Sequence, residues 1–155
     1  MKLREATETE MNDVYMMGFD AWSDDMTKES YLESCTNSSK YKKGKWWVLE
    51  NGQSELLCSL IVYQFESSVF GIGSIATPLK LRGKGYASDL VNKACTRLEQ
   101  KNKAKAIFLY SDIRPVFYEN LGFVKIRKEL QLYDSSICMI RCSTSADQIG
   151  IPKYF

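Results

Sequence analysis

Residues 71–101 read GIGSIATPLKLRGKGYASDLVNKACTRLEQK, and this stretch decides the fold. A strand is predicted over Val69 to Thr77, and a core-facing helix is predicted to begin just after Gly85 and run to Lys101, because apolar residues recur there at helical spacing. Those residues are Tyr86, Ala87, Leu90, Val91, Ala94, Cys95 and Leu98. Between strand and helix lies a tight basic turn whose two glycines can adopt dihedrals forbidden to other residues.

The turn has the properties of a phosphate site. The unpaired N–H groups at the start of the helix, and the positive end of its dipole, point into the turn. Lys80, Arg82 and Lys84 add positive charge beside them. The sequence therefore predicts that this turn binds a phosphate group.

Two common phosphate motifs do not fit the sequence. A P-loop requires G-x-x-x-x-G-K-[ST], whereas Gly83 and Lys84 are followed by Gly85. Residues 71–76 match G-x-G-x-x-A, but they lie inside the predicted strand and run into Thr77 and Pro78 instead of a helix. A dinucleotide fingerprint is therefore disfavoured.

The arrangement of a strand, [QR]-x-x-G-x-[GA] and a helix resembles the acyl-CoA-binding motif of the GNAT superfamily of N-acetyltransferases. The resemblance implies that the turn amides hold the CoA pyrophosphate and that main-chain groups of the preceding strand pair with the pantetheine arm. The matching turn residues are Arg82, Gly83, Lys84, Gly85, Tyr86, Ala87 and Ser88, and the strand residues are Ile75, Ala76 and Thr77.

A second motif lies further along the chain. The apolar run 107–110 is followed by residues 111–123, SDIRPVFYENLGF. This segment is similar to the strand, short helix and F-Y-x-x-L-G-F ending of the same family, in the expected order. The two motifs together make the resemblance specific.

The resemblance implies an α/β protein with the GNAT fold. That fold has a mixed, mostly antiparallel sheet of six to seven strands and about four helices. Its central parallel strands, here Val69 to Thr77 and Ala106 to Tyr110, splay apart and admit the acyl-CoA thioester. The length suits one domain over residues 1–155.

The remaining elements follow from local patterns. A strand is expected over Met1 to Ala6, and a capping box of Thr7 and Glu10 then opens a helix that extends to Trp22. Thr27 to Cys35 is predicted to be helical, and Lys45 to Glu50 with Glu55 to Phe65 form a hairpin joined at Asn51-Gly52. Strands are expected over Phe123 to Leu132 and Ser136 to Cys142, while the tail from Ser143 to Phe155 shows no pattern.

Composition narrows the class of protein. Apolar residues make up 45% and charged residues 26%, and no stretch is long and apolar enough for a membrane span or a signal peptide. These features predict a soluble, cytoplasmic protein with no membrane partner. The five cysteines are expected to be free thiols, and the absence of histidine argues against a metal site.

Charge is distributed unevenly along the chain. Residues 1–36 carry nine acids and three bases, so the remainder is strongly basic. This asymmetry favours a cationic partner at the acidic segment, although solvated helix faces account for it equally well. The basic run from Lys40 to Lys45 raises a nucleic-acid-binding module as an alternative, but the run lacks an aromatic-rich motif. We therefore expect no nucleic-acid partner, and a monomer or a homodimer.

Acetyl transfer to an amine requires a neutral nucleophile and a proton for the departing thiolate. Neutralising a lysine-like amine at pH 7 costs roughly 4.6 kcal/mol, so a base or a water chain must help. Without histidine, the base is a carboxylate acting through water, a tyrosine, or no specific group. By position, Glu66 and Asp112 are the candidate carboxylates.

Tyr118 matches the family tyrosine that protonates the leaving thiolate and contacts the cofactor, and its phenol suits that task. We expect Phe117 and Leu121 to face the core and Tyr118 to lie at the edge of that face. Many family members carry asparagine where this chain has Ser111. The serine hydroxyl can contact the cofactor or cap the short helix.

The resemblance thus implies an acetyl-CoA-dependent N-acetyltransferase. It would transfer the acetyl group to a primary amine, either a small molecule or a protein lysine or N-terminus, by direct attack in a ternary complex. A catalytically degenerate acyl-CoA-binding regulatory domain remains the alternative.

Overall fold

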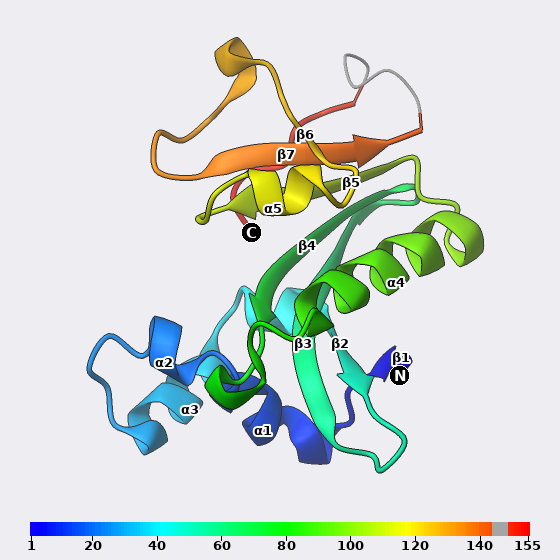
Figure 1. Ribbon diagram of the computed structural model, residues 1–155. Helices are drawn as coiled ribbons and strands as arrows, with labels where there is room; N and C mark the ends of the chain where they lie inside the picture. Colours follow the sequence, from blue (N-terminus) through cyan, green and yellow to red (C-terminus); the bar gives the residue numbers. More distant parts are fainter. Residues whose placement is uncertain (144–148) are drawn as a thin grey trace. The chain divides into compact units, whose positions relative to one another are not determined.

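The computed structural model describes residues 1–143 and 149–155. The strands are β1 (Lys2–Glu5), β2 (Lys45–Glu50), β3 (Leu56–Glu66), β4 (Val69–Ala76), β5 (Ala106–Ser111), β6 (Val124–Lys125) and β7 (Ile137–Cys142). The α-helices are α1 (Met11–Met16), α2 (Phe19–Trp22), α3 (Lys28–Asn37), α4 (Tyr86–Lys101) and α5 (Val116–Glu119) (Figure 1). Four short 3₁₀ helices cover Glu8–Glu10, Tyr41–Lys43, Leu79–Leu81 and Lys128–Leu130.

The strands form one sheet of seven, in the order β1-β2-β3-β4-β5-β7-β6. β4 and β5 pair in parallel, whereas the pairs β1–β2, β2–β3, β5–β7 and β6–β7 are antiparallel. The predicted α/β class and the predicted mixed, mostly antiparallel sheet are therefore confirmed.

The chain divides into two compact units. The first contains Met1–Tyr63 and Ser74–Ala94, and the second contains Gln64–Gly73 and Cys95–Phe155. That residues 1–155 act as a single domain stays a prediction.

In the first unit, helices contact both faces of the β2–β3 hairpin. Trp46 packs edge-on against Tyr15 of α1 and Tyr41, with ring centroids 5.7 and 5.0 Å apart. Cys58 of β3 donates its thiol proton to the carbonyl of Tyr86, the first residue of α4, at 3.3 Å. Leu49 of β2 and Leu60 of β3 are fully buried in this unit.

In the second unit, β5, β7, the first residue of β4 and the residue after β6 form a core made of Val69, Ala106, Phe108, Ile126, Cys138 and Ile140. Ile140 faces this core. Arg141 is its neighbour in β7 and points to the opposite face, where its guanidinium pairs with Glu99 of α4 at 2.7 Å. The two faces of β7 therefore pack against different parts of the unit.

Three elements differ from the sequence-based expectation. The first helix is broken, because α1 ends at Met16 and α2 begins after Gly18. A Cβ at Gly18 would lie only 2.1 Å from the ring of Trp22, so no larger residue fits there. The hairpin loop runs from Asn51 to Glu55 instead of turning at Asn51-Gly52, and the Asn51 side chain accepts hydrogen bonds from the backbone N–H groups of Gln53 and Glu55.

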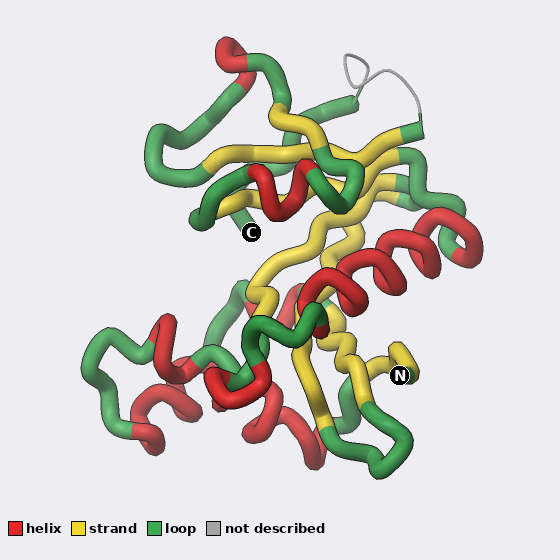
Figure 2. Tube along the Cα trace, viewed as in Figure 1, coloured by secondary structure: helices red, strands yellow, loops and turns green. Residues whose placement is uncertain are grey.

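The third difference is the length of a strand. A strand was expected over Phe123 to Leu132, but β6 contains only two residues. The side chain of Gln131 accounts for this. Its amide donates to the carbonyls of Ile126 and Cys138 and accepts from the N–H of Cys138. A side chain thus replaces the strand ladder there, and Figure 2 shows most of the connection to β7 as loop.

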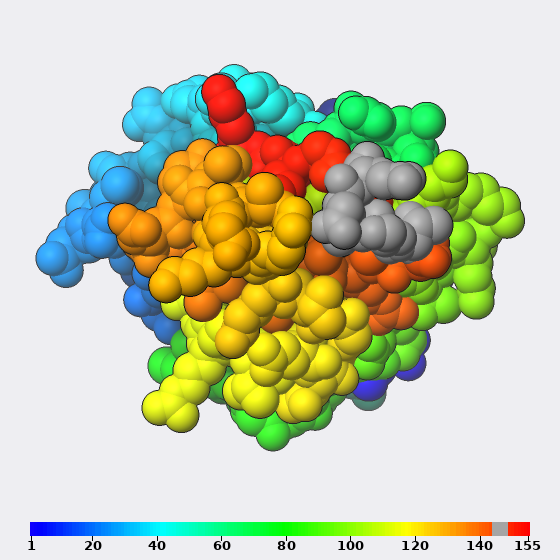
Figure 3. Space-filling model, turned by 90° about the horizontal axis from the view of Figure 1, so that it is seen from above, coloured from blue at the N-terminus to red at the C-terminus, as the bar shows by residue number. Residues whose placement is uncertain are grey.

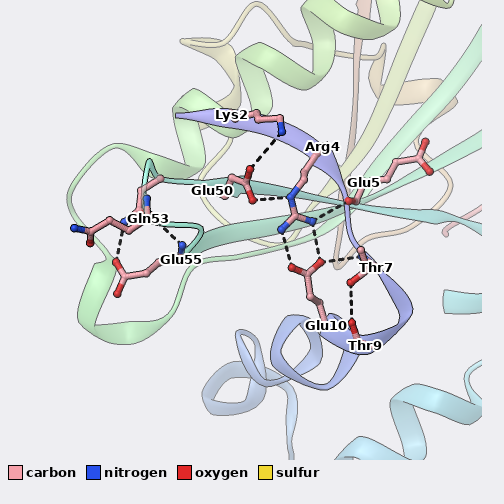
Figure 4. A network of polar contacts seen from close by, with 10 residues as sticks. Lys2, Arg4, Glu5, Thr7, Thr9, Glu10, Glu50, Gln53 and Glu55 are labelled. Atoms are coloured by element: carbon pink, nitrogen blue, oxygen red, sulfur yellow. Dashed lines mark hydrogen bonds and ion pairs between the residues drawn. The ribbon is translucent and has the colours of Figure 1, made fainter.

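Arg4 of β1 links the start of the chain to β2. Its guanidinium donates to both carboxylate oxygens of Glu10, at 2.7 and 2.8 Å, and to Glu50 at 2.6 Å (Figure 4). Glu10 also accepts from the backbone N–H of Thr7 at 2.9 Å, as the expected capping box requires, although the first turn is 3₁₀. The hydrogen bonds from Arg4 lower the pKa of Glu10 to about 2.

This ion pair predicts a loss of stability in acid. The pKa of Glu10 is lower in the folded chain, so its contribution is complete above the ordinary carboxyl pKa and disappears as the pH falls towards 2. We expect Glu10→Gln to reduce the free energy of unfolding at pH 7 by about 1 to 2 kcal/mol. Urea unfolding at pH 7 and pH 3 measures this. The difference between the two proteins should shrink at pH 3, and an equal difference at both pH values would contradict the prediction.

Candidate cofactor and catalytic site

The glycine turn has the backbone that its sequence requires. Gly83 and Gly85 have φ angles of 75° and 82°, in the left-handed region that favours glycine. A Cβ added at either position would meet no atom within 4 Å, so the space above both residues is open. The turn is therefore an exposed surface over which a ligand can approach the main chain.

Helix α4 begins directly after this turn. The N–H of Asp89 donates to the carbonyl of Gly85 at 3.0 Å and makes the first helical hydrogen bond. The amides of Tyr86, Ala87 and Ser88 precede it and belong to the first turn, where N–H groups have no partner within a helix. With Lys84 exposed beside them, this end of α4 suits an anion.

Arg82 fixes the turn to two other segments. Its Nε donates to the carbonyl of Thr77 at 2.9 Å, and its terminal nitrogen donates to Asp20 of α2 at 2.7 Å. The side chain of Arg82 thus connects the turn with the end of β4 and with the acidic segment. Asp20 is consequently engaged in an ion pair within the protein.

The end of β4 contains the residues expected to meet the pantetheine arm. β4 pairs with β5 only from Val69 to Gly71, opposite Ala106 to Phe108, among the residues that the structure describes. Beyond this point Ser74 has a φ of 44°, a strained value for a residue other than glycine, although β4 continues to Ala76. Ile75, Ala76 and Thr77 follow this residue, and their contact with a pantetheine arm stays a prediction.

Ser111 does not cap the short helix. Its side chain is buried and donates to the carbonyl of Ile113 at 2.8 Å, which fixes the turn after β5. α5 begins at Val116, and Pro115 at its N-cap position makes no side-chain hydrogen bond. The capping expectation is wrong because the helix begins too far along the chain, while the cofactor contact stays a prediction.

Tyr118 of α5 is more deeply buried than expected, with 8% of its surface exposed. Its ring packs against Phe117 and Phe123, at centroid distances of 4.9 and 6.2 Å. Burial, and secondarily the negative charge of Asp112, raise its pKa to about 12. The phenol therefore holds its proton at neutral pH, as a proton donor must.

The two candidate carboxylates have different surroundings. Asp112 follows β5, and its oxygens accept from the hydroxyl of Ser136 at 2.6 Å and from that of Tyr154 at 3.1 Å. Glu66 is the exposed last residue of β3. A catalytic role for Glu66 stays a prediction.

Sequence reasoning missed the part played by the tail. Ile149, Ile151 and Phe155 pack against the core of the second unit, and Tyr154 lies between them and donates to Asp112. Tyr154 also packs against the rings of Tyr110 and Tyr133, at 5.1 and 5.9 Å. The only signal in the sequence for this packing was the pair of aromatic residues Tyr154 and Phe155, in a tail that otherwise shows no pattern.

The structure groups the predicted site residues by unit. The first unit brings together the turn and residues 75–77, and the second holds Ser111, Asp112 and Tyr118. Across residues 1–143 and 149–155, no group of side chains is suited to a metal ion. Within the same residues, no helix has the length and apolar character needed to cross a membrane.

Comparisons with known proteins give the family. A sequence model of the acetyltransferase (GNAT) domain matches residues 2–126. No curated protein sequence matches the chain.

Several solved structures share the fold. A chimera of spermidine N-acetyltransferase SpeG from Vibrio cholerae and hSSAT is 16% identical, with a TM-score of 0.70 over 92% of this chain and 96% of that one. GCN5 from Tetrahymena is 14% identical, with a TM-score of 0.68 over 92% and 96% of the two chains. A GNAT-family acetyltransferase from Staphylococcus aureus is 13% identical, with a TM-score of 0.65 over 91% and 98%. With the family match over most of its length, the chain belongs to the GNAT acetyltransferases.

Proposed function

We propose that this protein transfers the acetyl group of acetyl-CoA to a primary amine. The observation that carries the proposal is the open, left-handed turn of Gly83 and Gly85 at the start of α4, in a chain of the GNAT family. The geometry fits an anionic ligand, because free space, helix amides and basic side chains occur at the same place.

Each part of the cofactor has a corresponding segment in this proposal. The amides of the turn from Arg82 to Ser88 hold the pyrophosphate, with Lys84 contributing charge. Main-chain groups of Ile75, Ala76 and Thr77 accompany the pantetheine arm. The carbonyl of Thr77 already accepts from Arg82, so this contact must share that oxygen or use its neighbours. The proposal assigns Ser111 and Tyr118 to the thioester end.

The chemistry is direct attack of the amine on the thioester carbonyl. A C–N bond forms, the C–S bond breaks, and the amine loses a proton. Tyr118 supplies a proton to the departing sulfur, and water restores the phenol. Asp112 serves as a negative charge that favours the protonated phenol, or as a base through water.

The acceptor in this proposal is a cationic amine, a polyamine or a lysine side chain. The acidic segment of residues 1–36 supports this choice, with Asp24 and Asp25 both exposed. The name of the structural neighbour SpeG, a spermidine N-acetyltransferase, is consistent with it. Because Asp20 is paired with Arg82, its charge is partly neutralised within the protein.

A regulatory domain that binds acyl-CoA without turnover is the second candidate. The observation in its favour is that both oxygens of Asp112 already accept hydrogen bonds from the chain's own hydroxyls, those of Ser136 and Tyr154. For either function we propose a cytoplasmic location, because all five cysteines are free.

The test has two steps. Calorimetric titration with acetyl-CoA should show micromolar binding, and a screen of amines with thiol release as the readout should give turnover with spermidine but not with an acidic amine such as glutamate. Absence of binding would overturn the proposed function. Binding without turnover on any amine or lysine peptide would leave the regulatory candidate in its place.

A further inference from the structure

The helix that carries Tyr118 depends on its surroundings. α5 has only four residues, and a helix of a single turn is not stable by itself in water. It ends in a Schellman motif, in which the N–H of Phe123 donates to the carbonyl of Tyr118 at 3.1 Å. The N–H of Gly122 donates to the carbonyl of Glu119, also at 3.1 Å, and Gly122 has the left-handed φ of 83° that the motif requires. The carbonyl of the buried Leu121 takes no part in the motif, so it needs a donor from elsewhere.

Arg141 of β7 is that donor. Its Nη1 donates to the carbonyl of Leu121 at 2.9 Å. Its Nε and Nη2 donate to the two carboxylate oxygens of Glu99, at 2.7 and 3.1 Å. Because the guanidinium is planar, this two-point contact with Glu99 fixes the direction of the third nitrogen. One side chain of β7 therefore connects the last turn of α4 with the turn that ends α5.

The contact is anchored in the sheet of the second unit. Glu99, Leu121 and Arg141 all belong to that unit. Arg141 pairs with Ile107 of β5, so its backbone is held by the strand ladder. In Figure 3 the yellow atoms around α5 lie beside the orange-red atoms of β7. The short helix is thus attached to a strand and not only to the loops at its ends.

The turn that Arg141 holds is also the immediate support of Tyr118. The carbonyl of Tyr118 accepts from the N–H groups of both Leu121 and Phe123, at 2.9 and 3.1 Å. The ring of Tyr118 packs against the ring of Phe123, which is almost completely buried. A displacement of the Leu121 carbonyl would therefore shift the backbone of Tyr118 and one of the rings that contact its side chain.

The ion pair of Arg141 and Glu99 is by itself a weak source of stability. Both side chains are partly exposed, at 25% and 37%, and solvent screens such pairs. What the pair provides is an orientation, because it points the remaining nitrogen of Arg141 at the carbonyl of Leu121. The expected consequence of breaking it is a change in local geometry and not a loss of the fold.

We propose that Arg141 is a positioning residue for Tyr118. Glu99 orients the guanidinium, the guanidinium holds the turn after α5, and the turn keeps the phenol in place while its O–H proton passes to the departing sulfur. The inference rests on the proposed function, in which Tyr118 is the proton donor. In this role Arg141 acts through the backbone and supplies no proton itself.

The test measures kcat in a double-mutant cycle of Arg141→Lys and Tyr118→Phe, with thiol release as the readout. Lysine keeps the positive charge but lacks the planar fork that binds Glu99 and the carbonyl of Leu121 together. Arg141→Lys should lower kcat by about tenfold in the wild-type chain, with the acetyl-CoA Kd within twofold, because a small displacement of a catalytic group is costly. In the Tyr118→Phe chain the same change should lower kcat by less than twofold, since no phenol is left to position.

A second measurement needs no turnover. In protein labelled with ¹³C-tyrosine, the NMR signal that is missing from Tyr118→Phe identifies Tyr118. That signal should move in Arg141→Lys. It should stay in place in Lys125→Gln, which removes an exposed ion pair with Glu119 of α5 but leaves the turn after the helix intact, and this control should keep the wild-type kcat. Glu99→Gln, which weakens the two-point contact, should give a smaller loss of kcat and serves if the lysine variant does not fold.

The failures of the two proposals are distinguishable. An unchanged kcat in Arg141→Lys, an equal fall of kcat in both chains of the cycle, or an unmoved Tyr118 signal in folded Arg141→Lys would overturn the positioning role alone. A wild type without turnover on any amine would overturn the proposed transfer reaction and the positioning role together. A wild type with the same kcat as Tyr118→Phe would remove Tyr118 as the donor, and the positioning role with it.

Discussion

Replacing Gly85 by aspartate is expected to weaken acetyl-CoA binding by at least about 100-fold, because a carboxylate beside a pyrophosphate is a like-charge contact costing several kcal/mol. Gly85 has a φ of 82° and open space above it, so the new side chain would extend over the surface proposed for the phosphates. The turn amides would still be present but would lie next to a negative charge. Calorimetric titration of both proteins with acetyl-CoA measures the effect.

A matched variant shows whether the loss of affinity in Gly85→Asp comes from charge or from backbone strain. Gly85→Asn has nearly the same shape as Gly85→Asp and tolerates a left-handed backbone about as well, but it is neutral. It should lose far less affinity than the aspartate variant, and Gly83→Asp should behave like Gly85→Asp. Gly52→Asp, also in open space but in the β2–β3 loop, should bind normally. Equal losses in the asparagine and aspartate variants would show that the loss comes from strain and not from a phosphate site.

Replacing Tyr118 by phenylalanine is expected to lower kcat by about 100-fold, the lower range for general acid catalysis, with the acetyl-CoA Kd unchanged within about twofold. The ring is packed between Phe117 and Phe123, so phenylalanine preserves the packing and removes only the hydroxyl. Steady-state kinetics with thiol release as the readout, together with calorimetry, separates the two quantities. An unchanged kcat would exclude Tyr118 as the proton donor.

The pH dependence provides a second check on Tyr118. Its pKa of about 12 exceeds the ordinary tyrosine value, so the donor stays protonated and its contribution persists as the pH rises through 10. Because the charge of Asp112 contributes to this rise, Asp112→Asn should lower the pKa of Tyr118. NMR titration of ¹³C-labelled tyrosine in the folded protein measures the shift without any turnover. A pKa that does not move would contradict a role for Asp112 beside the phenol.

The parts of the fold that were predicted correctly are those whose sequence patterns extend over only a few neighbouring residues. The glycine turn, the apolar stripe of α4 and the strand before it were located correctly because helical periodicity and glycine chemistry act within a few residues. Gly122 belongs to the same group, since its φ of 83° requires glycine in the L-G-F ending. The backbone of the glycine turn was therefore predicted from the sequence alone, while its role as a phosphate site stays a prediction.

The unpredicted parts depend on contacts between distant residues. Nothing in residues 123–132 shows that the side chain of Gln131 will bond to Ile126 and Cys138 and so shorten β6. The two hydroxyl donors to Asp112 come from Ser136 and Tyr154, which no local pattern relates to β5. The burial of Tyr118 likewise depends on the core that forms around a helix of only four residues.

The fit between Gly71 and Phe155 makes two distant positions interdependent. A methyl group at position 71 occupies the volume that the ring at position 155 needs, so either change alone leaves a clash or a void. Changing both together would restore the packing with the volume moved from one residue to the other. A designer who alters residue 155 of this protein must therefore choose residue 71 at the same time.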